Sequence, residues 1–308
     1  MRERIIALGI FVMAFLGGSA QDLDINDVLG RYFGANGDNY IQPVADAFGA
    51  NMNSGLFHTA YIRSGMKFQL YFGLQTMFAY IPESSKSFEA KTEGDYFPEM
   101  TVEGVPTICG DPDGKIVEGP EGTKYYFPGG FDLDYLPYAT PQLTVGSLYG
   151  TDFTVRLLSA RPMASRLSME EQEWINSLYM LGWGVRHNIS QWLDLSGMEI
   201  AVGYYRQTLS SEDYIDIRSR LISLQFSYNL AAFTLYAGVG FETSSMILNY
   251  HSEELSVDFD LSGINKVRTT IGATFNMGPV KLSAEYNLSK QRTFSVGLGV
   301  GFNDFKRD

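Results

Sequence analysis

The sequence predicts an all-β protein: a transmembrane antiparallel β-barrel of ten to twelve or more strands, with an N-terminal helical plug segment. Apolar and polar residues alternate with period two along segments of about ten residues, which is typical of strands with one apolar and one polar face. After the N-terminus, no run approaches the roughly 18 apolar residues of a membrane helix. The 21 Phe, 19 Tyr and 32 Gly and the mean hydropathy of -0.08 also suit alternating strands better than membrane helices.

The first 20 residues predict a signal peptide. A charged start, Met1–Arg4, precedes the apolar run Ile5–Leu16, and small residues follow, with Gly18 and Ala20 at the −3 and −1 positions of a cleavage site. The apolar run is shorter than the roughly 20 residues of a spanning helix. A buried N-terminal helix is the alternative. We therefore expect an exported protein.

Residues 21–53 do not alternate, and they predict either a plug in the barrel or a loose periplasmic segment. Asp38 or Asn39 can cap a short helix whose apolar face holds Ile41, Val44, Ala45 and Phe48. Residues 54–308 form the predicted barrel. Its ten candidate strands are 66–80, 141–148, 152–158, 174–187, 197–207, 215–229, 233–250, 264–277, 280–290 and 293–305. Residues 56–62 either belong to the plug or add a strand to a twelve-stranded barrel.

Strand length and turn length favour a barrel over a soluble β-sandwich, which also alternates. Most of the candidate strands exceed the mode of about 5–6 residues in sandwiches. Tight turns such as Met277–Pro279 alternate with longer connections, as in outer-membrane barrels with short periplasmic turns. A periplasmic C-terminus makes 66–80 run outward, so the long connection 81–140 is expected outside the cell. Within it, Asp111–Lys115 predicts a plain turn and not a calcium loop.

An aromatic cluster lies near the end of this outer loop. It has two interpretations: an aromatic girdle at the membrane interface, or a lid whose aromatic side covers an apolar ligand. The ligand-lid candidates are Tyr125, Tyr126, Phe127, Phe131 and Tyr135.

Charged residues of both signs are expected on the lumen face of the strands. Such a set forms either a paired network that supports the barrel or a selective polar path. The lumen-lining candidates are Lys67, Arg156, Arg186, Glu199, Glu242, Arg268, Lys281 and Glu285. A slip of one residue would turn any of them outward.

Several functions find little support in the sequence. The net charge of -12 argues against nucleic acid as a partner. We expect no cofactor and no metal site, because no ligand spacing appears. His58, His187 and His251 are scattered, so we expect no enzyme. Cys109 is the sole cysteine and predicts no disulfide. The expected partners are outer-membrane lipid, the barrel-assembly machinery (through the aromatic strand Phe294–Phe302) and a hydrophobic small molecule.

Three segments carry a resemblance to known proteins. Tyr40–Gly55 with Phe57–Ala60, Leu136–Gly146 and Gly184–Gln191 resemble an uncharacterised Bacteroidota-type family of barrel proteins, over nearly all of the mature chain. More distantly, the layout is similar to FadL-type transporters of hydrophobic compounds, with an N-terminal plug and a long early outer loop. The chain is shorter than those transporters and lacks their Asn-Pro-Ala hatch motif.

The resemblance implies an outer-membrane location. It favours a passive conduit for small hydrophobic molecules, with the aromatic loop capturing the ligand and the plug moving to let it pass. The alternative is a non-transporting structural barrel or a docking platform for secreted or surface proteins, and an outer-membrane hydrolase is a third, weaker hypothesis.

Overall fold

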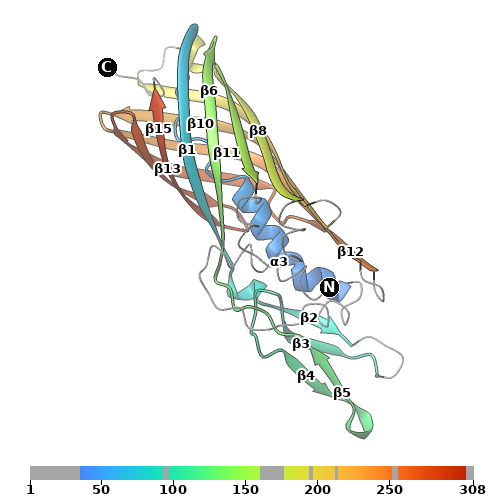
Figure 1. Cartoon of the computed structure of the whole chain (residues 1–308). Helices are drawn as coiled ribbons and strands as arrows, with labels where there is room; N and C mark the ends of the chain where they lie inside the picture. The colour runs from blue at the N-terminus through green and yellow to red at the C-terminus, as the bar shows by residue number, and fades with distance from the viewer. Residues whose placement is uncertain are drawn as a thin grey trace.

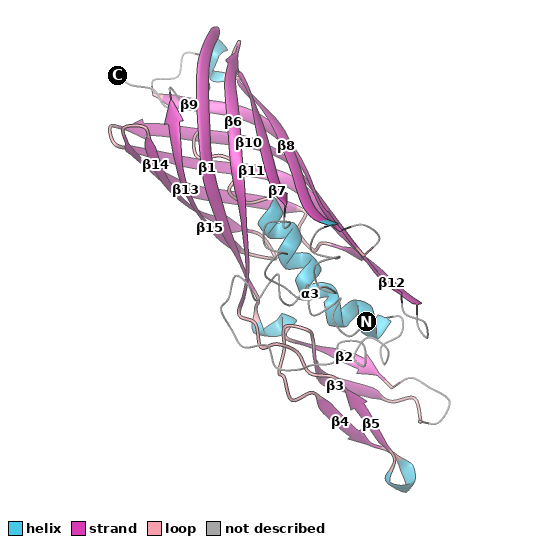
Figure 2. Cartoon of the chain, viewed as in Figure 1, coloured by secondary structure: helices cyan, strands magenta, loops and turns pink. Residues whose placement is uncertain are grey.

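The computed structural model describes residues 35–92, 97–159, 177–193, 197–211, 214–251 and 256–302. The expected signal peptide and part of the loop after residue 159 lie outside the described residues. A closed antiparallel barrel of ten strands dominates the structure, with a helix at one of its mouths (Figures 1 and 2). The predicted fold class is therefore confirmed. None of the described helices is long and apolar enough to cross a membrane.

The barrel strands follow one another around the ring in chain order. They are β1 (Met66–Tyr80), β6 (Tyr135–Leu148), β7 (Thr151–Ser159), β8 (Leu178–Asn188), β9 (Met198–Ser211), β10 (Ile215–Leu230), β11 (Phe233–His251), β13 (Val267–Met277), β14 (Val280–Leu288) and β15 (Thr293–Phe302). The first and last strands close the ring, with Leu70 opposite Phe302 and Ala79 opposite Thr293. Closure leaves no free sheet edge, which a strand structure in lipid requires.

Turn length distinguishes the two ends of the barrel. At the end where β1 begins, two-residue turns join β6 to β7, β10 to β11 and β13 to β14, and a longer connection joins β8 to β9. Tyr149 and Gly150 both have positive φ, 50° and 77°, as in the two-residue hairpin turns that match strand twist. The long connections after β1, β7 and β11 lie at the other end, together with shorter ones after β9 and β14. Because outer-membrane barrels keep their short turns on the periplasmic side, we name these the inner and the outer end.

The long outer connection folds into a small lobe of two hairpins beyond the outer mouth (Figure 1). Its strands are β2 (Ser87–Lys91), β3 (Thr101–Pro106), β4 (Lys115–Glu118) and β5 (Lys124–Phe127), with short 3-10 turns at Glu83–Ser85 and Pro120–Gly122. A further strand, β12 (Ser256–Ser262), pairs with the outer part of β11. The sequence pattern did not predict these five strands. Asp111–Lys115 does form a turn, in which the Asp113 N–H donates to the Asp111 carboxylate at 2.9 Å.

One barrel strand is longer than predicted. β6 begins at Tyr135 and not at residue 141, and it contains Pro137 and Pro141. Both prolines pair with β1, whereas β7 first pairs at Gln142. The prolines therefore lie where one side of β6 has no barrel neighbour, and a residue without an N–H is tolerated there.

The helix α3 (Ala35–Met52) lies in the outer mouth, between the lobe and the barrel wall (Figure 1). Its apolar face includes the predicted Ile41, Val44, Ala45 and Phe48, all buried in the largest apolar cluster. After the helix, residues 53–62 run through the barrel to its inner end and form no strand. We call residues 35–62 the plug segment.

Candidate functional site

The interior of the barrel and its plug segment form the candidate site, and the interior has two zones. In the outer zone the inward side chains are mostly apolar and belong to the same buried cluster as the apolar face of α3; they include Met77, Leu178, Met180, Leu209, Ile215, Ile217 and Met246. In the inner zone the inward side chains are mostly polar or charged and buried. A water-filled porin lumen is polar, so the apolar outer zone is a distinguishing feature of this barrel.

Arg156 of β7 binds the main chain of the plug segment. Its Nη1 donates to the Met52 carbonyl at 3.2 Å, and its Nη2 donates to the carbonyls of Ser54 and Gly55 at 2.9 and 2.6 Å. Its Nε donates to Gln142 at 2.9 Å. Among the described residues, no carboxylate lies within ion-pair distance of Arg156. Neutral carbonyls therefore satisfy this fully buried cation.

Arg268 of β13 binds the C-terminal end of α3. Its Nη2 donates to the Ala50 carbonyl at 2.8 Å and its Nη1 to the Asn53 carbonyl. The carboxylate of Glu242 on β11 lies 3.1 Å from Nη2 and also accepts a hydrogen bond from the Asn53 amide at 3.0 Å. A cation at the carbonyl end of a helix is favourable, since the last carbonyls lack partners in the helix.

Two more wall groups bind the segment further inward. Arg186 of β8 forms a bidentate ion pair with Asp152 of β7 and donates to the Thr59 carbonyl. Glu285 of β14 accepts the Gly55 N–H at 2.7 Å. Gly55 has a φ of 65°, a conformation that only glycine adopts at little cost.

Uncharged side chains complete this binding of the main chain. They donate to carbonyls of the plug segment as follows: Gln207 to Met52, Gln142 to Leu56, Thr274 to His58, Gln69 to Tyr61, and Asn188 to Ile62. The wall thus contacts the plug segment mainly through its backbone, over its whole passage through the lumen.

The structure places seven of the eight lumen-lining candidates inside the barrel. Arg156, Arg186, Glu199, Glu242, Arg268, Lys281 and Glu285 are at most 8% exposed. Glu199 accepts hydrogen bonds from Asn188 and Ser190 at the inner end, and Lys281 donates to the Gly278 carbonyl at 3.3 Å. Lys67 does not join them. It is exposed, because the register of β1 shifts between Met66 and Gln69.

The five ligand-lid candidates do not form one surface. Phe127 is fully buried beneath the lobe, with Tyr125 packed on it at a ring distance of 4.9 Å, and Phe131 also packs on the apolar cluster. Tyr135 lies on the outside of the barrel, 5.5 Å from the ring of Tyr80. Tyr126 is 38% exposed. The structure therefore divides the predicted cluster between the lobe core and the outer wall.

The polar amides and hydroxyls that bind the plug segment were not among the sequence candidates. A detectable signal existed, because Gln142, Gln207 and Asn188 occupy inward positions of alternating strands. Inward tyrosines were missed as well. The ring of Tyr205 covers Gly184 and that of Tyr236 covers Gly272, where an added Cβ would lie 2.2 and 2.3 Å from the ring.

The histidines lie apart from one another. His58 is buried in the plug segment and its ring packs on Tyr71 at 4.2 Å. His187 lies at the inner end, where Nδ1 is 2.8 Å from the Thr151 hydroxyl. The side chain of His251 lies outside the described residues. Within the described part of the chain, no three His, Cys, Asp or Glu side chains are grouped so that they could hold a metal.

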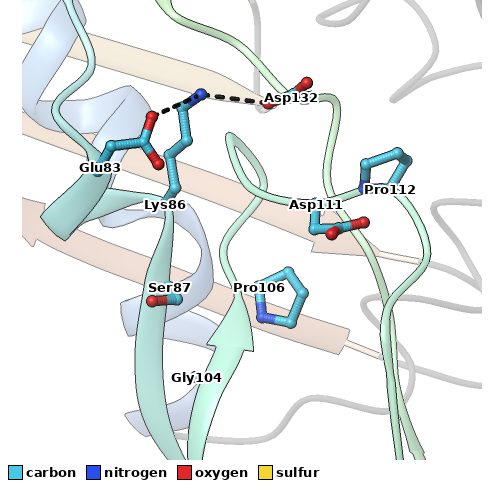
Figure 3. A pocket seen from close by; sticks show the side chains of 8 residues that line it. All are labelled: Glu83, Lys86, Ser87, Gly104, Pro106, Asp111, Pro112 and Asp132. Carbon is cyan, nitrogen blue, oxygen red and sulfur yellow. Dashed lines mark hydrogen bonds and ion pairs between the residues drawn. The ribbon is translucent and has the colours of Figure 1, made fainter.

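A cavity of about 310 Å³ opens in the lobe (Figure 3). Lys86 lies at its wall, 2.6 Å from Asp134 and 3.1 Å from Asp132. These carboxylates raise the pKa of the Lys86 ammonium above its usual range, Asp134 most strongly. The Lys86 side chain is 12% exposed. Its ion pairs with Asp132 and Asp134 connect the base of the lobe to the residues that lead back into β6.

Fold and interior together define a plugged transmembrane β-barrel. Residues 1–302 match a family of unknown function, DUF6588. The chain belongs to this family, which confirms the resemblance to an uncharacterised family of barrel proteins. No curated protein matches the chain.

The chain also matches several solved structures at low sequence identity. The TodX ΔS2S3 mutant monoaromatic hydrocarbon channel is 10% identical, with 81% of this chain and 93% of that chain covered and a TM-score of 0.29. The Ralstonia pickettii toluene transporter TbuX is 7% identical, with 86% and 95% covered and a TM-score of 0.29. An OmpT loop-deletion mutant of Vibrio cholerae is 12% identical, with 77% and 98% covered and a TM-score of 0.27.

Proposed function

We propose that the chain is a passive conduit of the bacterial outer membrane for small hydrophobic molecules, with the plug segment as its movable obstruction. The apolar outer zone of the interior is the observation that carries this proposal. Met77, Met180 and Met246, on three different strands, belong to the same buried apolar cluster as the apolar face of α3. When α3 moves, it uncovers an apolar chamber, and such a chamber takes up hydrophobic solutes better than ions or sugars.

The inner part of the plug segment, residues 53–62, suits such a movement because mainly hydrogen bonds from the wall hold it. Arg156 and Arg268 donate to carbonyls, and water can replace each of these bonds at a net cost of about 1 kcal/mol for a neutral bond and more for a charged donor. The plug segment can therefore leave the wall while the backbone hydrogen bonds between the barrel strands stay intact. The fold needs outer-membrane lipid around its exposed apolar belt, and we propose that the barrel-assembly machinery inserts it.

The lobe has a different role in this proposal from the one predicted for a lid. Phe127 and Phe131 belong to the packing beneath the lobe, so they do not face solvent as a capture surface. The lobe instead covers the outer mouth together with α3, and capture falls to the outer zone itself. We assign no reaction to the chain, since its histidines serve packing and hydrogen bonding where the structure describes them.

A disulfide that locks the plug segment to the wall tests this function. The hydroxyls of Ser54 and Thr293 lie 2.7 Å apart, so Ser54→Cys with Thr293→Cys, in a Cys109→Ala background, places two thiols together. A matched control crosslinks only the wall: Thr144 and Thr154 face each other on β6 and β7, with hydroxyls 2.9 Å apart. Uptake of radiolabelled toluene is measured in cells that export each variant, before and after reduction.

The conduit hypothesis expects the plug lock to abolish uptake until a reductant opens the disulfide, and the wall crosslink to have no effect. Uptake at the wild-type rate through the locked barrel would show that plug movement is not needed. Absence of uptake by the wild-type chain, relative to cells without it, would reject the conduit outright.

The density of bonds to the plug segment favours a second candidate, a non-transporting barrel that serves as a structural element or docking platform for secreted or surface proteins. Carbonyls from Met52 to Ile62 accept hydrogen bonds from the barrel wall. Such continuous binding is expected of a plug that stays in place permanently. Here the wild-type chain transports nothing and retains a protein subunit on gentle purification.

A further inference from the structure

Three arginines gather on the outer surface of the barrel, on neighbouring strands β9 and β10. Arg206, Arg218 and Arg220 each lie between two buried, inward residues, so their side chains point away from the lumen. Arg218 and Arg220 are exposed and Arg206 is half-buried. In a chain with a net charge of -12, this wall is locally positive.

The strand register brings two of these arginines, Arg206 and Arg220, into one row with an aromatic residue. Arg206 lies directly opposite Arg220 on one side and Trp183 on the other. The next row toward the inner end is apolar, with Tyr204 opposite Ile222, and the ring of Tyr204 lies 5.5 Å from that of Trp183. Aromatic side chains at such positions mark the interface between hydrocarbon and headgroups.

Polar residues continue from this row toward the outer end. Thr243 lies opposite Arg220, and Thr208 lies opposite Arg218. The arginines are therefore at the border where the apolar belt of β9 and β10 ends, on the side of the long loops. With the short turns on the periplasmic side, this border faces the outer leaflet.

The charges of the three arginines are only partly compensated within the described part of the chain. Asp216 pairs with Arg218 at 2.8 Å. No described carboxylate forms an ion pair with Arg206 or Arg220. Like charges directly opposite on neighbouring strands destabilise a sheet, so an anion between the two guanidinium groups would relieve their repulsion.

We propose that Arg206 and Arg220 bind a phosphate group of a phosphorylated glycolipid in the outer leaflet, with Trp183 against its sugar or acyl region. Guanidinium groups bind phosphate with two parallel hydrogen bonds, and the adjacent threonines offer further donors. The proposal rests on the outer-membrane placement proposed above, but not on transport. A chain that binds the lipid and carries no toluene leaves this site intact and rejects the conduit.

Native mass spectrometry of the purified full chain, titrated with bisphosphorylated lipid A, tests the site. The test variant is Arg206→Gln with Arg220→Gln. Its control is Lys290→Gln with Arg292→Gln, which removes the same charge from two exposed residues at the outer end. Two further arms use lipid A without phosphate groups and inorganic phosphate alone. Heat-modifiable migration on gels verifies that each variant is a folded barrel.

We expect the test variant to bind bisphosphorylated lipid A at least about tenfold more weakly than the wild type and the control. Removing the lipid phosphates should weaken wild-type binding to the same extent, and inorganic phosphate should bind detectably only at far higher concentration. Equal binding by the wild type and the test variant, or indifference of the wild type to the lipid phosphates, would overturn the proposal. Inorganic phosphate that binds as tightly as the lipid would show an anion site and not a glycolipid site.

Discussion

Arg156 and Glu285 bind the same residue of the plug segment from separate parts of the barrel wall. Arg156 on β7 donates to the Gly55 carbonyl at 2.6 Å, while Glu285 on β14 accepts the Gly55 N–H at 2.7 Å. Opposite charges thus hold the two polar groups of one glycine. Neither contact depends on a side chain of the plug segment.

Replacing Arg156 should loosen the plug segment and leave the barrel intact. Arg156→Met removes the donor to three carbonyls, and hydrogen bonds to a charged group contribute about 1.5–3 kcal/mol each. We expect at least about 3 kcal/mol lower stability of the plugged state and faster amide exchange over residues 52–56, measured by hydrogen–deuterium exchange. Arg292→Met, at an exposed site, is the control. Unchanged exchange in Arg156→Met would mean that the remaining bonds suffice.

Gly55→Ala should destabilise the plugged state more than Gly65→Ala does. Both glycines have positive φ, 65° and 73°, and alanine in that conformation costs about 1–2 kcal/mol. An added Cβ at Gly55 would also lie 3.2 Å from Gln75 Oε1, whereas Gly65 has open space. Urea unfolding in detergent measures both variants. Equal losses of unfolding free energy in the two variants would show that backbone strain alone determines the destabilisation.

Breaking the buried pair of Arg268 and Glu242 should cost more than removing it. Glu242→Gln leaves the guanidinium beside a neutral amide, and loss of one partner of a buried pair typically costs about 3–5 kcal/mol. Arg268→Met combined with Glu242→Gln should recover part of that loss, although the helix end then lacks its cation. A double-mutant cycle of unfolding free energies measures the coupling. Strict additivity would show that the two side chains act independently.

Cys109 should report the integrity of the lobe. Burial raises the pKa of its thiol from 9.0 to about 12, and a thiolate is the reactive form. We expect negligible labelling by a maleimide at pH 8 in the folded chain and full labelling once urea opens the lobe. Because the folded state retains its proton where the unfolded state releases it, lobe stability should fall as pH rises above about 9. Rapid labelling of the native chain would contradict the buried placement.

The sequence predicted the barrel well because each strand carries its own evidence. Residues such as Val280, Leu282 and Ala284 alternate with Lys281 and Ser283, and this pattern assigns them to two opposite faces. In a membrane barrel the polar face turns inward. The same alternation placed Arg156, Arg268 and Glu285 in the lumen. It could not place Lys67, because a local shift in register leaves no mark in the pattern.

What those charges bind could not be predicted. Their partners are carbonyl and amide groups of residues 50–59, and every residue type carries such groups. The position of Phe127 was equally hidden, since an aromatic residue of a loop can pack inward or face lipid. The strands β2–β5 are short, and only their pairing with one another identifies them.

The pairing of β1 with β15 has a consequence for how the molecule assembles. The ring cannot shut until the final strand meets the first, yet residues 53–62 precede β1 in the chain and end up enclosed by all ten strands. If the barrel closed first, α3 would have to pass through a lumen that the inward side chains of the wall narrow. We therefore expect the wall to close around the segment, with Arg156, Arg186 and Arg268 binding its carbonyls while the last strands pair.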